Sequence, residues 1–175
     1  MYHIEDNFYP FEIFNNILHI VKQYPINHVP EKYDGKRCSY GVARQYLTSE
    51  STLSSLILSN FPHIPQYKRK IEIANDVNGF WLKPHSDHSA KRKVTVIYLE
   101  GQKENGTTFY LQDRNEKINF VSNRAVIFKP DSKDTYDETS LKHSVEKIEI
   151  TEVRRTIVVT YVDNSWNDIE TCYDR

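Results

Sequence analysis

Three residues of the kinds that bind transition metals stand out in this chain: His85, Asp87 and His143. In an extended chain residues i and i+2 point to the same side, so the side chains of His85 and Asp87 can reach one metal ion. The pair alone is a weak signal, because seven histidines and 24 acidic residues in 175 positions produce about one such pair by chance, and His3 with Glu5 is a second copy. His143 distinguishes the pair at His85, because it begins a further expected strand downstream.

Such a set supports the chemistry of a non-haem iron site. Imidazole and carboxylate suit Fe(II), and two histidines with one carboxylate on one face of the ion leave three positions open for a chelating cosubstrate and oxygen. Apart from His143, only His88 competes as a nitrogen ligand after Asp87, and in an extended strand it points away from His85 and Asp87. The alternative is three unrelated polar residues in surface loops.

Arg154 is the candidate for binding an acidic ligand. It lies eleven residues after His143 and begins an apolar strand. Arginine presents a rigid fork of donors that pairs with a carboxylate at two points. The alternative is a strand-end arginine in a surface ion pair, and Arg155 takes the binding role if the strand is shifted by one residue.

The elements that must position these residues are of two kinds. Apolar residues at three- and four-residue steps predict helices at 11–21 and 51–58. Short β-rich runs separated by polar turns follow, at 71–74, 80–82, 93–99, 107–111, 118–121, 125–128, 145–150 and 156–162. The segment 131–140 is expected to be an exposed loop. The pattern predicts an α+β, mainly β, fold in which N-terminal helices buttress a jelly-roll-like pair of sheets.

The length, 175 residues and 20.7 kDa, predicts one domain over residues 1–175, with a helical part at about 1–65 and a β core at about 70–163.

With 23 basic and 24 acidic residues, the chain as a whole has no electrostatic field that attracts nucleic acid or an anionic membrane. The basic triplets at 68–70 and 91–93 are interpreted as solvated surface, with binding of an acidic or phosphate-bearing substrate as the alternative. Arg44 is a candidate for the rim of a substrate site.

Cys38 and Cys172 cannot build a disulfide framework and lack the short spacing of a zinc or redox motif. The N-terminus carries Glu5 and Asp6 where a signal peptide needs positive charge, and no apolar run approaches 18 residues. We therefore expect a cytoplasmic protein without a membrane partner.

Over about residues 71–162 the chain resembles the 2-oxoglutarate- and Fe(II)-dependent dioxygenases, most closely their prolyl-4-hydroxylase-like branch. The resemblance rests on Leu-Lys-Pro-His-Ser-Asp at 82–87, Val-Thr-Val-Ile-Tyr-Leu at 94–99, Asn-Gly-Thr-Thr-Phe at 105–109, and His-Ser-Val at 143–145 leading to Arg-Arg-Thr at 154–156. The order and spacing of these segments agree with the family.

The resemblance implies a double-stranded β-helix (jelly roll) that holds Fe(II) with His85, Asp87 and His143. It also implies that 2-oxoglutarate chelates the iron while its distal carboxylate meets Arg154. Thr156 matches a hydroxyl position in that pocket, and Tyr98 matches a strand whose tyrosines often bond the cosubstrate.

Two departures from the family are visible in the sequence. Asn105-Gly106 stands where the family often has Gly-Gly, and Asn75, ten residues before His85, stands where close relatives frequently have tyrosine. The first is expected to be harmless, and the second bears on the cosubstrate pocket.

The activity implied is hydroxylation of a prolyl or other amino-acid residue in a peptide, or of a free amino acid or small molecule, with O2 consumed and ascorbate as a candidate reductant. Asp87 as the carboxylate ligand argues against halogenation. One alternative is a nucleic-acid demethylase on the same scaffold, but that group has a further arginine six residues after the cosubstrate arginine, where this chain has Thr160. Another is a metal-binding jelly roll without catalysis.

Overall fold

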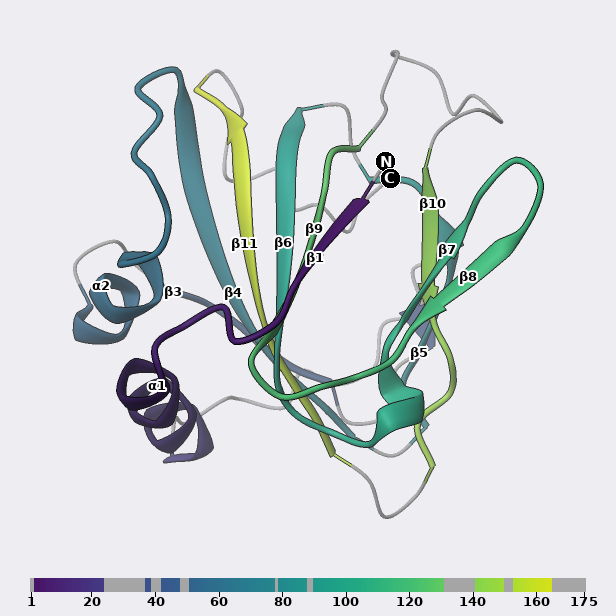
Figure 1. Cartoon of the computed structure of the whole chain (residues 1–175), viewed down its shortest axis with the longest axis horizontal. Coiled ribbons are helices and arrows are strands. Elements are labelled where there is room, and N and C mark those ends of the chain that lie inside the picture. Colours follow the sequence, from purple (N-terminus) through teal and green to yellow (C-terminus); the bar gives the residue numbers. More distant parts are fainter. Residues whose placement is uncertain are drawn as a thin grey trace.

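The computed structural model describes residues 2–23, 37–38, 42–47, 51–77, 79–87, 90–130, 141–149 and 153–164. In this part of the chain two antiparallel sheets face each other, and two helices cover the outer side of the larger sheet (Figure 1). The helices are α1 (Phe11–Gln23) and α2 (Thr52–Leu58), and a short 3-10 turn, η1, spans Lys103–Asn105.

The larger sheet has six strands, and its two longest strands, β4 and β11, lie side by side. Its spatial order is β1 (Tyr2–Glu5), β9 (Arg124–Phe128), β6 (Lys91–Glu100), β11 (Val153–Asp163), β4 (Tyr67–Val77) and β3 (Val42–Leu47). Strand β11 pairs with β4 along its whole length and with β6 on its other side. Residues of β11 are therefore held from both sides.

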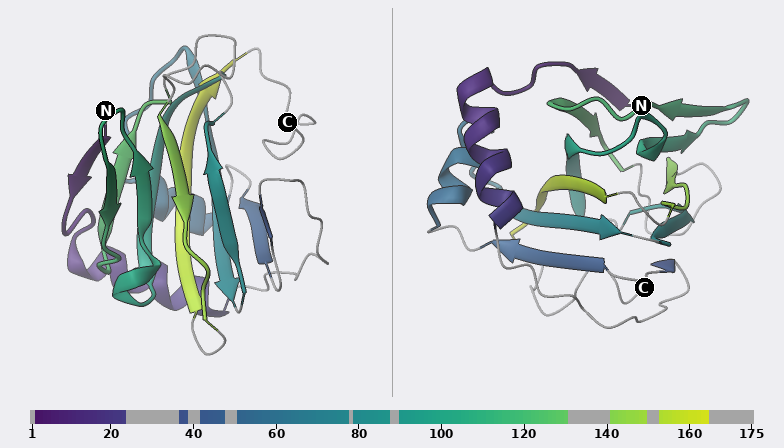
Figure 2. Two further views of the ribbon diagram at one scale, coloured as in Figure 1. Left: turned by 90° about the vertical axis from the view of Figure 1, so that its right-hand side faces the viewer. Right: turned by 90° about the horizontal axis from the view of Figure 1, so that it is seen from below.

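The smaller sheet has five short strands and faces the viewer in the left view of Figure 2. Its order is β2 (Arg37–Cys38), β5 (Trp81–His85), β10 (Lys142–Val145), β7 (Thr107–Tyr110) and β8 (Asn115–Ile118). Because consecutive strands of the chain repeatedly change sheet, the arrangement is the jelly roll that the sequence predicts.

Successive side chains along each strand of the larger sheet point alternately into two different cores, as the two-residue period of a strand requires. One set of side chains packs under the helices and includes Ile71, Ile73, Ile97, Ile157, Val159 and Tyr161. The other set packs between the sheets and includes Val94, Val96, Tyr98, Val126 and Phe128 with Phe109 of β7. Inward-facing positions of β4, β6 and β11 are therefore the even-numbered ones near the centre of the sheet.

The helices close the first of these cores. The buried residues of α1 are Phe14, Ile17 and Val21, at the three- and four-residue steps that predict it. Helix α2 begins after Ser51, whose hydroxyl accepts a hydrogen bond from the backbone N–H of Ser54 at 3.0 Å. None of the helices in the described residues has the length and apolar character needed to cross a membrane.

Two of the predicted strands are wrong in position. The strand predicted at 118–121 is observed at Asn115–Ile118, and the one predicted at 145–150 is observed at Lys142–Val145. Both predictions followed apolar content, whereas pairing with β7 fixes the observed positions, in which Asn115 and Lys117 of β8 are exposed and His143 and Ser144 of β10 are buried. The predicted loop at 131–140, His88 and Cys172 lie outside the described residues.

The N-terminal part is not purely helical, because residues 1–65 also contribute β1, β2 and β3. Strand β1 pairs with β9, and β3 pairs with β4, so these segments complete the two edges of the larger sheet. These segments form strands by pairing with strands elsewhere in the sequence. Local periodicity does not reveal such pairing.

Candidate active site

The structure brings His85, Asp87 and His143 together. His85 is the last residue of β5, and His143 lies directly opposite it on β10, while Asp87 follows two residues after β5. One ligand atom from each of the three residues lies within 4.8 Å of the others. The pairing of two short strands therefore joins residues that are far apart in the sequence.

Contacts around the two histidines fix their rings. Nδ1 of His85 lies 2.8 Å from the carbonyl oxygen of Lys83, so a protonated Nδ1 donates there and leaves Nε2 as a lone-pair ligand. The His143 ring packs against Phe128, at 4.9 Å between ring centroids, and against the His85 ring at 4.3 Å. His3 and Glu5, the second His-x-acid pair, are exposed on β1.

The two oxygens of Asp87 have different neighbours. Oδ2 lies 3.9 Å from Nε2 of His143, and Oδ1 accepts a hydrogen bond from Nζ of Lys91 at 2.5 Å. Burial raises the pKa of Asp87, but the positive charge of Lys91 and the histidines outweighs burial and holds the pKa well below its usual value. The carboxyl group is therefore ionised and ready to bind a cation.

The donor set fits a divalent transition metal. Two imidazole nitrogens and one carboxylate oxygen within one small volume match the facial set of non-haem Fe(II) sites, which keeps positions open for other ligands. Metal binding by His85, Asp87 and His143 stays a prediction, now with geometry that agrees with it.

Arg154 lies at the other end of the space between the sheets and is buried, with 4% of its surface exposed. Its Nη1 donates to Oδ2 of Asp76 at 2.8 Å, and its Nε donates to the carbonyl oxygen of Asn105 at 2.8 Å. Asp76 lies directly opposite Arg154 on β4 and is fully buried. The guanidinium is thus held by a carboxylate of the chain itself.

Thr156 and Tyr98 both lie next to the guanidinium group of Arg154. Oγ1 of Thr156 is 3.5 Å from Nη1 of Arg154, and the Tyr98 ring lies under the guanidinium at 5.8 Å. Burial raises the pKa of Tyr98, and Arg154 and Thr107 offset this only in part, so the phenol is neutral and donates to Oγ1 of Thr107 at 2.8 Å. The sequence-predicted residues Arg154, Thr156 and Tyr98 therefore form one cluster.

The neighbouring Arg155 points to the other side of the sheet. It forms an ion pair with Glu100, which also pairs with Lys22 of α1 at 2.8 Å. Asn75 lies opposite Arg155, and its side-chain oxygen is buried with no hydrogen-bond partner among the described residues. The register of β11 thus turns Arg154, and not Arg155, into the space between the sheets.

This architecture has counterparts among solved protein structures. No family model matches the chain, and no curated protein matches its sequence. Among solved structures, a prolyl-4-hydroxylase from Pseudomonas putida superposes with a TM-score of 0.70 at 14% identity, covering 93% of this chain and 92% of that one. The fold is that of the 2-oxoglutarate- and Fe(II)-dependent oxygenases.

Two further structures with this oxygenase fold are similar. A viral collagen prolyl hydroxylase from Paramecium bursaria Chlorella virus-1, solved as a 2-oxoglutarate complex, gives a TM-score of 0.60 at 16% identity and covers 92% of this chain and 94% of that one. HygX from Streptomyces hygroscopicus, solved with nickel and 2-oxoglutarate bound, gives 0.65 at 10% identity and covers 95% and 84%. The predicted likeness to prolyl-4-hydroxylases is thereby confirmed at the level of the fold.

The Asn105-Gly106 pair supports the arginine cluster of this oxygenase fold. A Cβ atom on Gly106 would lie 1.7 Å from the carbonyl oxygen of Ile118, so only glycine fits this close approach of two backbones. The approach places the carbonyl of the buried Asn105 at Nε of Arg154. Gly-Gly is therefore not required, because Asn105 contributes its backbone carbonyl.

Sequence reasoning missed Asp76, Asn105 and Lys91 as partners of the predicted site residues. Asp76 had a usable signal, because Ile71 and Ile73 mark the odd positions of β4 as the helix side, which turns position 76 inward. No local pattern marks Lys91, which contacts Asp87 from the first position of β6.

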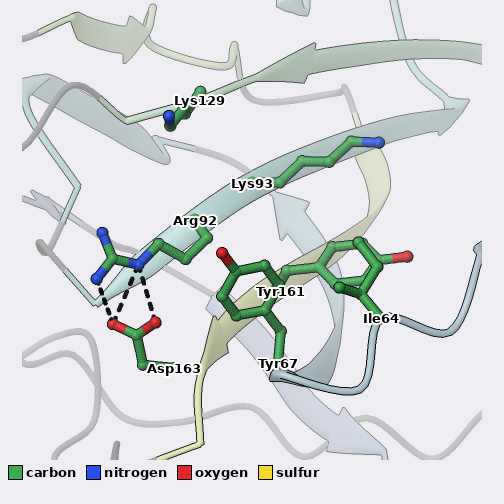
Figure 3. Close-up of a pocket in the computed structure, with 7 residues that line it drawn as sticks. All are labelled: Ile64, Tyr67, Arg92, Lys93, Lys129, Tyr161 and Asp163. Atoms are coloured by element: carbon green, nitrogen blue, oxygen red, sulfur yellow. Dashed lines mark hydrogen bonds and ion pairs between the residues drawn. The ribbon is translucent and has the colours of Figure 1, made fainter.

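A second hollow of about 400 Å³ lies at the ends of β4, β6, β9 and β11 (Figure 3). Its basic side chains are Arg92, Lys93 and Lys129. Arg92 forms a bidentate pair with Asp163, at 2.6 and 2.9 Å, and Nζ of Lys93 lies 5.8 Å from the centroid of the Tyr161 ring. The triplet at 91–93 is therefore divided among three different contacts and does not form one basic surface.

Proposed function

We propose that this protein is an Fe(II)-dependent oxygenase that couples oxidative decarboxylation of a 2-oxo acid, 2-oxoglutarate in the first instance, to hydroxylation of an organic substrate. The observation that carries the proposal is the group of His85, Asp87 and His143 in a fold shared with enzymes of this chemistry. Bound Fe(II) would supply the redox chemistry, by which O2 oxidises the 2-oxo acid to carbon dioxide and a shortened acid and one oxygen atom enters a C–H bond.

The protein's own residues would hold and orient the reactants. His85, Asp87 and His143 would bind the metal through one face and leave the opposite face for the 2-oxo acid and oxygen. Phe109 and Phe128 line the His143 ring and limit access of water from the interior. Arg154, Thr156 and Tyr98 would meet the tail of the 2-oxo acid.

The spacing of these two groups supports one shared ligand. The ring of Phe128, which contacts His143, lies on β9 opposite Val94, and Tyr98 at the arginine cluster is four residues further along β6. At 3.3 Å per residue the two levels are about 13 Å apart along the strand. A five-carbon acid, with a metal bond at one end and a long arginine side chain at the other, spans a gap of this order.

For the substrate we propose an amino-acid residue in a peptide, prolyl in the first instance, with a free amino acid or small molecule as the alternative within the same class. The support is that two of the similar structures are named as prolyl hydroxylases. Loops around such sites set the substrate, and they vary on one scaffold.

The test is formation of succinate from 2-oxoglutarate in the presence of Fe(II), ascorbate and one of three substrate panels: proline-rich peptides, free amino acids or single-stranded oligonucleotides. We expect stimulation by peptides or amino acids, and none in the D87A variant. Stimulation by oligonucleotides alone would favour the demethylase alternative. Absence of turnover with all panels, and of metal binding, would favour neither enzyme and refute the proposal.

A further inference from the structure

The inner face of the larger sheet carries a second buried charge beside Arg154. Asp76 has none of its surface exposed, and its Oδ2 accepts a hydrogen bond from Nη1 of Arg154 at 2.8 Å. The two residues face each other across β4 and β11, in direct register. The contact is therefore built into the pairing of the two longest strands of the molecule.

Asp76 cannot easily leave this position. Strand β4 is paired on both sides, and Asp76 lies opposite Arg154 on β11 and opposite Val42 on β3. The guanidinium is fixed as well, because Nε donates to the carbonyl oxygen of Asn105 and the Tyr98 ring covers one face. A ligand that reaches Arg154 meets both partners of the ion pair.

The charge balance of this cluster differs from that of a simple carboxylate-binding arginine. An arginine without an internal partner would neutralise the distal carboxylate of 2-oxoglutarate. Here the guanidinium already has the carboxylate of Asp76 as a partner before a ligand arrives, in a place where Arg154 is 4% exposed and Asp76 is fully buried. Like charges that share a buried site disfavour each other, so the second carboxylate gains little from Arg154.

We propose that Asp76 determines the specificity of the 2-oxo acid pocket, and that the pocket accepts 2-oxo acids with an uncharged tail about as well as 2-oxoglutarate. This inference rests on the proposed function and names the class of its cosubstrate. The Asp76–Arg154 pair offers both an acceptor and a donor, so an uncharged polar tail would find partners there about as readily as a second anion.

The first test uses the unmodified protein. Calorimetry with the Mn(II)-loaded chain gives dissociation constants for 2-oxoglutarate and for 2-oxopentanoate, which has the same five carbons but a methyl group in place of the distal carboxylate. We expect the two constants to agree within tenfold. A preference of tenfold or more for 2-oxoglutarate would overturn the inference, and this comparison needs no variant that has to fold.

The second test changes the charge of the pocket. In Asp76→Asn, Arg154 loses its buried carboxylate partner, so we expect the preference for 2-oxoglutarate over 2-oxopentanoate to rise by tenfold or more, about 1.4 kcal/mol. The matched control is Glu100→Gln, which removes the carboxylate partner of the adjacent Arg155 on the opposite side of the sheet. It should leave the preference unchanged. An unchanged preference in D76N, in a folded protein, would refute the role of Asp76.

The outcomes separate this inference from the function on which it rests. If the chain binds no Mn(II), or if the loaded chain binds neither 2-oxo acid, the proposed function fails and the inference fails with it. If the loaded chain binds both acids but prefers 2-oxoglutarate by tenfold or more, the function stands and only the role of Asp76 fails.

Discussion

The two ends of the space between the sheets each hold a carboxylate next to a cation, but the two pairs are built differently. At the end with the predicted metal ligands His85, Asp87 and His143, here called the metal end, Asp87 accepts a hydrogen bond from Lys91, the first residue of β6. At the other end Asp76 and Arg154 face each other in the middle of paired strands. The ammonium of Lys91 is carried on a four-carbon stem with rotatable bonds, so we expect a bound metal to displace it, whereas Asp76 and Arg154 lie on strands whose backbones are paired.

The difference teaches what each pair can do. We expect a carboxylate whose partner is the end of a long lysine side chain to exchange that cation for a metal ion. A carboxylate and guanidinium locked in register set the charge of a pocket and do not exchange. Removing a partner should therefore change ligand binding at both ends, but should lower the stability of the fold mainly at the arginine end.

The largest expected effect is on stability at the arginine end. Arg154→Leu leaves Asp76 buried without its cation, and breaking a buried pair in this way costs about 3–5 kcal/mol of unfolding free energy. Arg155→Leu removes a partly exposed arginine from Glu100 and should cost at most about 1 kcal/mol. Urea denaturation of both variants measures the difference.

The double variant Asp76→Leu with Arg154→Leu sharpens this prediction. Replacing both charges by apolar side chains removes the unpaired ion, so at least half of the loss in R154L should be recovered. Equal stability of R154L and R155L would show that the buried pair has no special role in the fold.

The next effect is loss of the metal. Asp87→Ala removes the only carboxylate of the group His85, Asp87 and His143, so we expect Mn(II) affinity to fall at least 100-fold, about 2.8 kcal/mol. Circular dichroism should show an unchanged fold, because Asp87 lies outside the strands, two residues after the end of β5. Tight, stoichiometric Mn(II) binding by D87A in calorimetry would refute the assignment of the ligands.

Gly106→Ala tests the support of the arginine end. The new Cβ would overlap the carbonyl oxygen of Ile118 at 1.7 Å, so the backbone must move, at a cost of about 2–3 kcal/mol in urea denaturation. The control is Gly101→Ala, whose Cβ would meet only the Phe120 ring at 3.0 Å and should cost less. A cost no greater in G106A than in G101A would mean that the Asn105 carbonyl is not held by this contact.

These two ends also differ in how far the sequence reveals them. His85, Asp87 and Arg154 are visible because their spacing lies within single strands or turns, and the alternation of β11 separates Arg154 from Arg155. Asp76 and Lys91 are not visible in the same way, because Asp76 meets Arg154 through strand pairing and Lys91 reaches Asp87 from the start of the next strand. For the same reason β1 and β3 escape prediction, since their partners β9 and β4 lie far along the chain. Local pattern identifies residue types and faces, and long-range pairing decides which charges meet.

The smallest expected effect concerns Lys91. Its ammonium lies 2.5 Å from Oδ1 of Asp87, on the opposite oxygen from the one that faces His143. Any interaction between this ammonium and a divalent cation bound by Asp87 is repulsive, so removing the charge should favour the metal. Lys91→Met should raise Mn(II) affinity by about tenfold, or about 1.4 kcal/mol.

Lys93→Met is the matched control for Lys91, since it removes the same charge from the same strand at a residue that lies over the Tyr161 ring. It should change Mn(II) affinity by less than twofold in the same titration. If K91M instead binds Mn(II) more weakly, Lys91 orients Asp87 for the metal and does not compete with it. The metal end would then be as firmly pre-organised as the arginine end, and the contrast between an exchangeable and a locked carboxylate would fail.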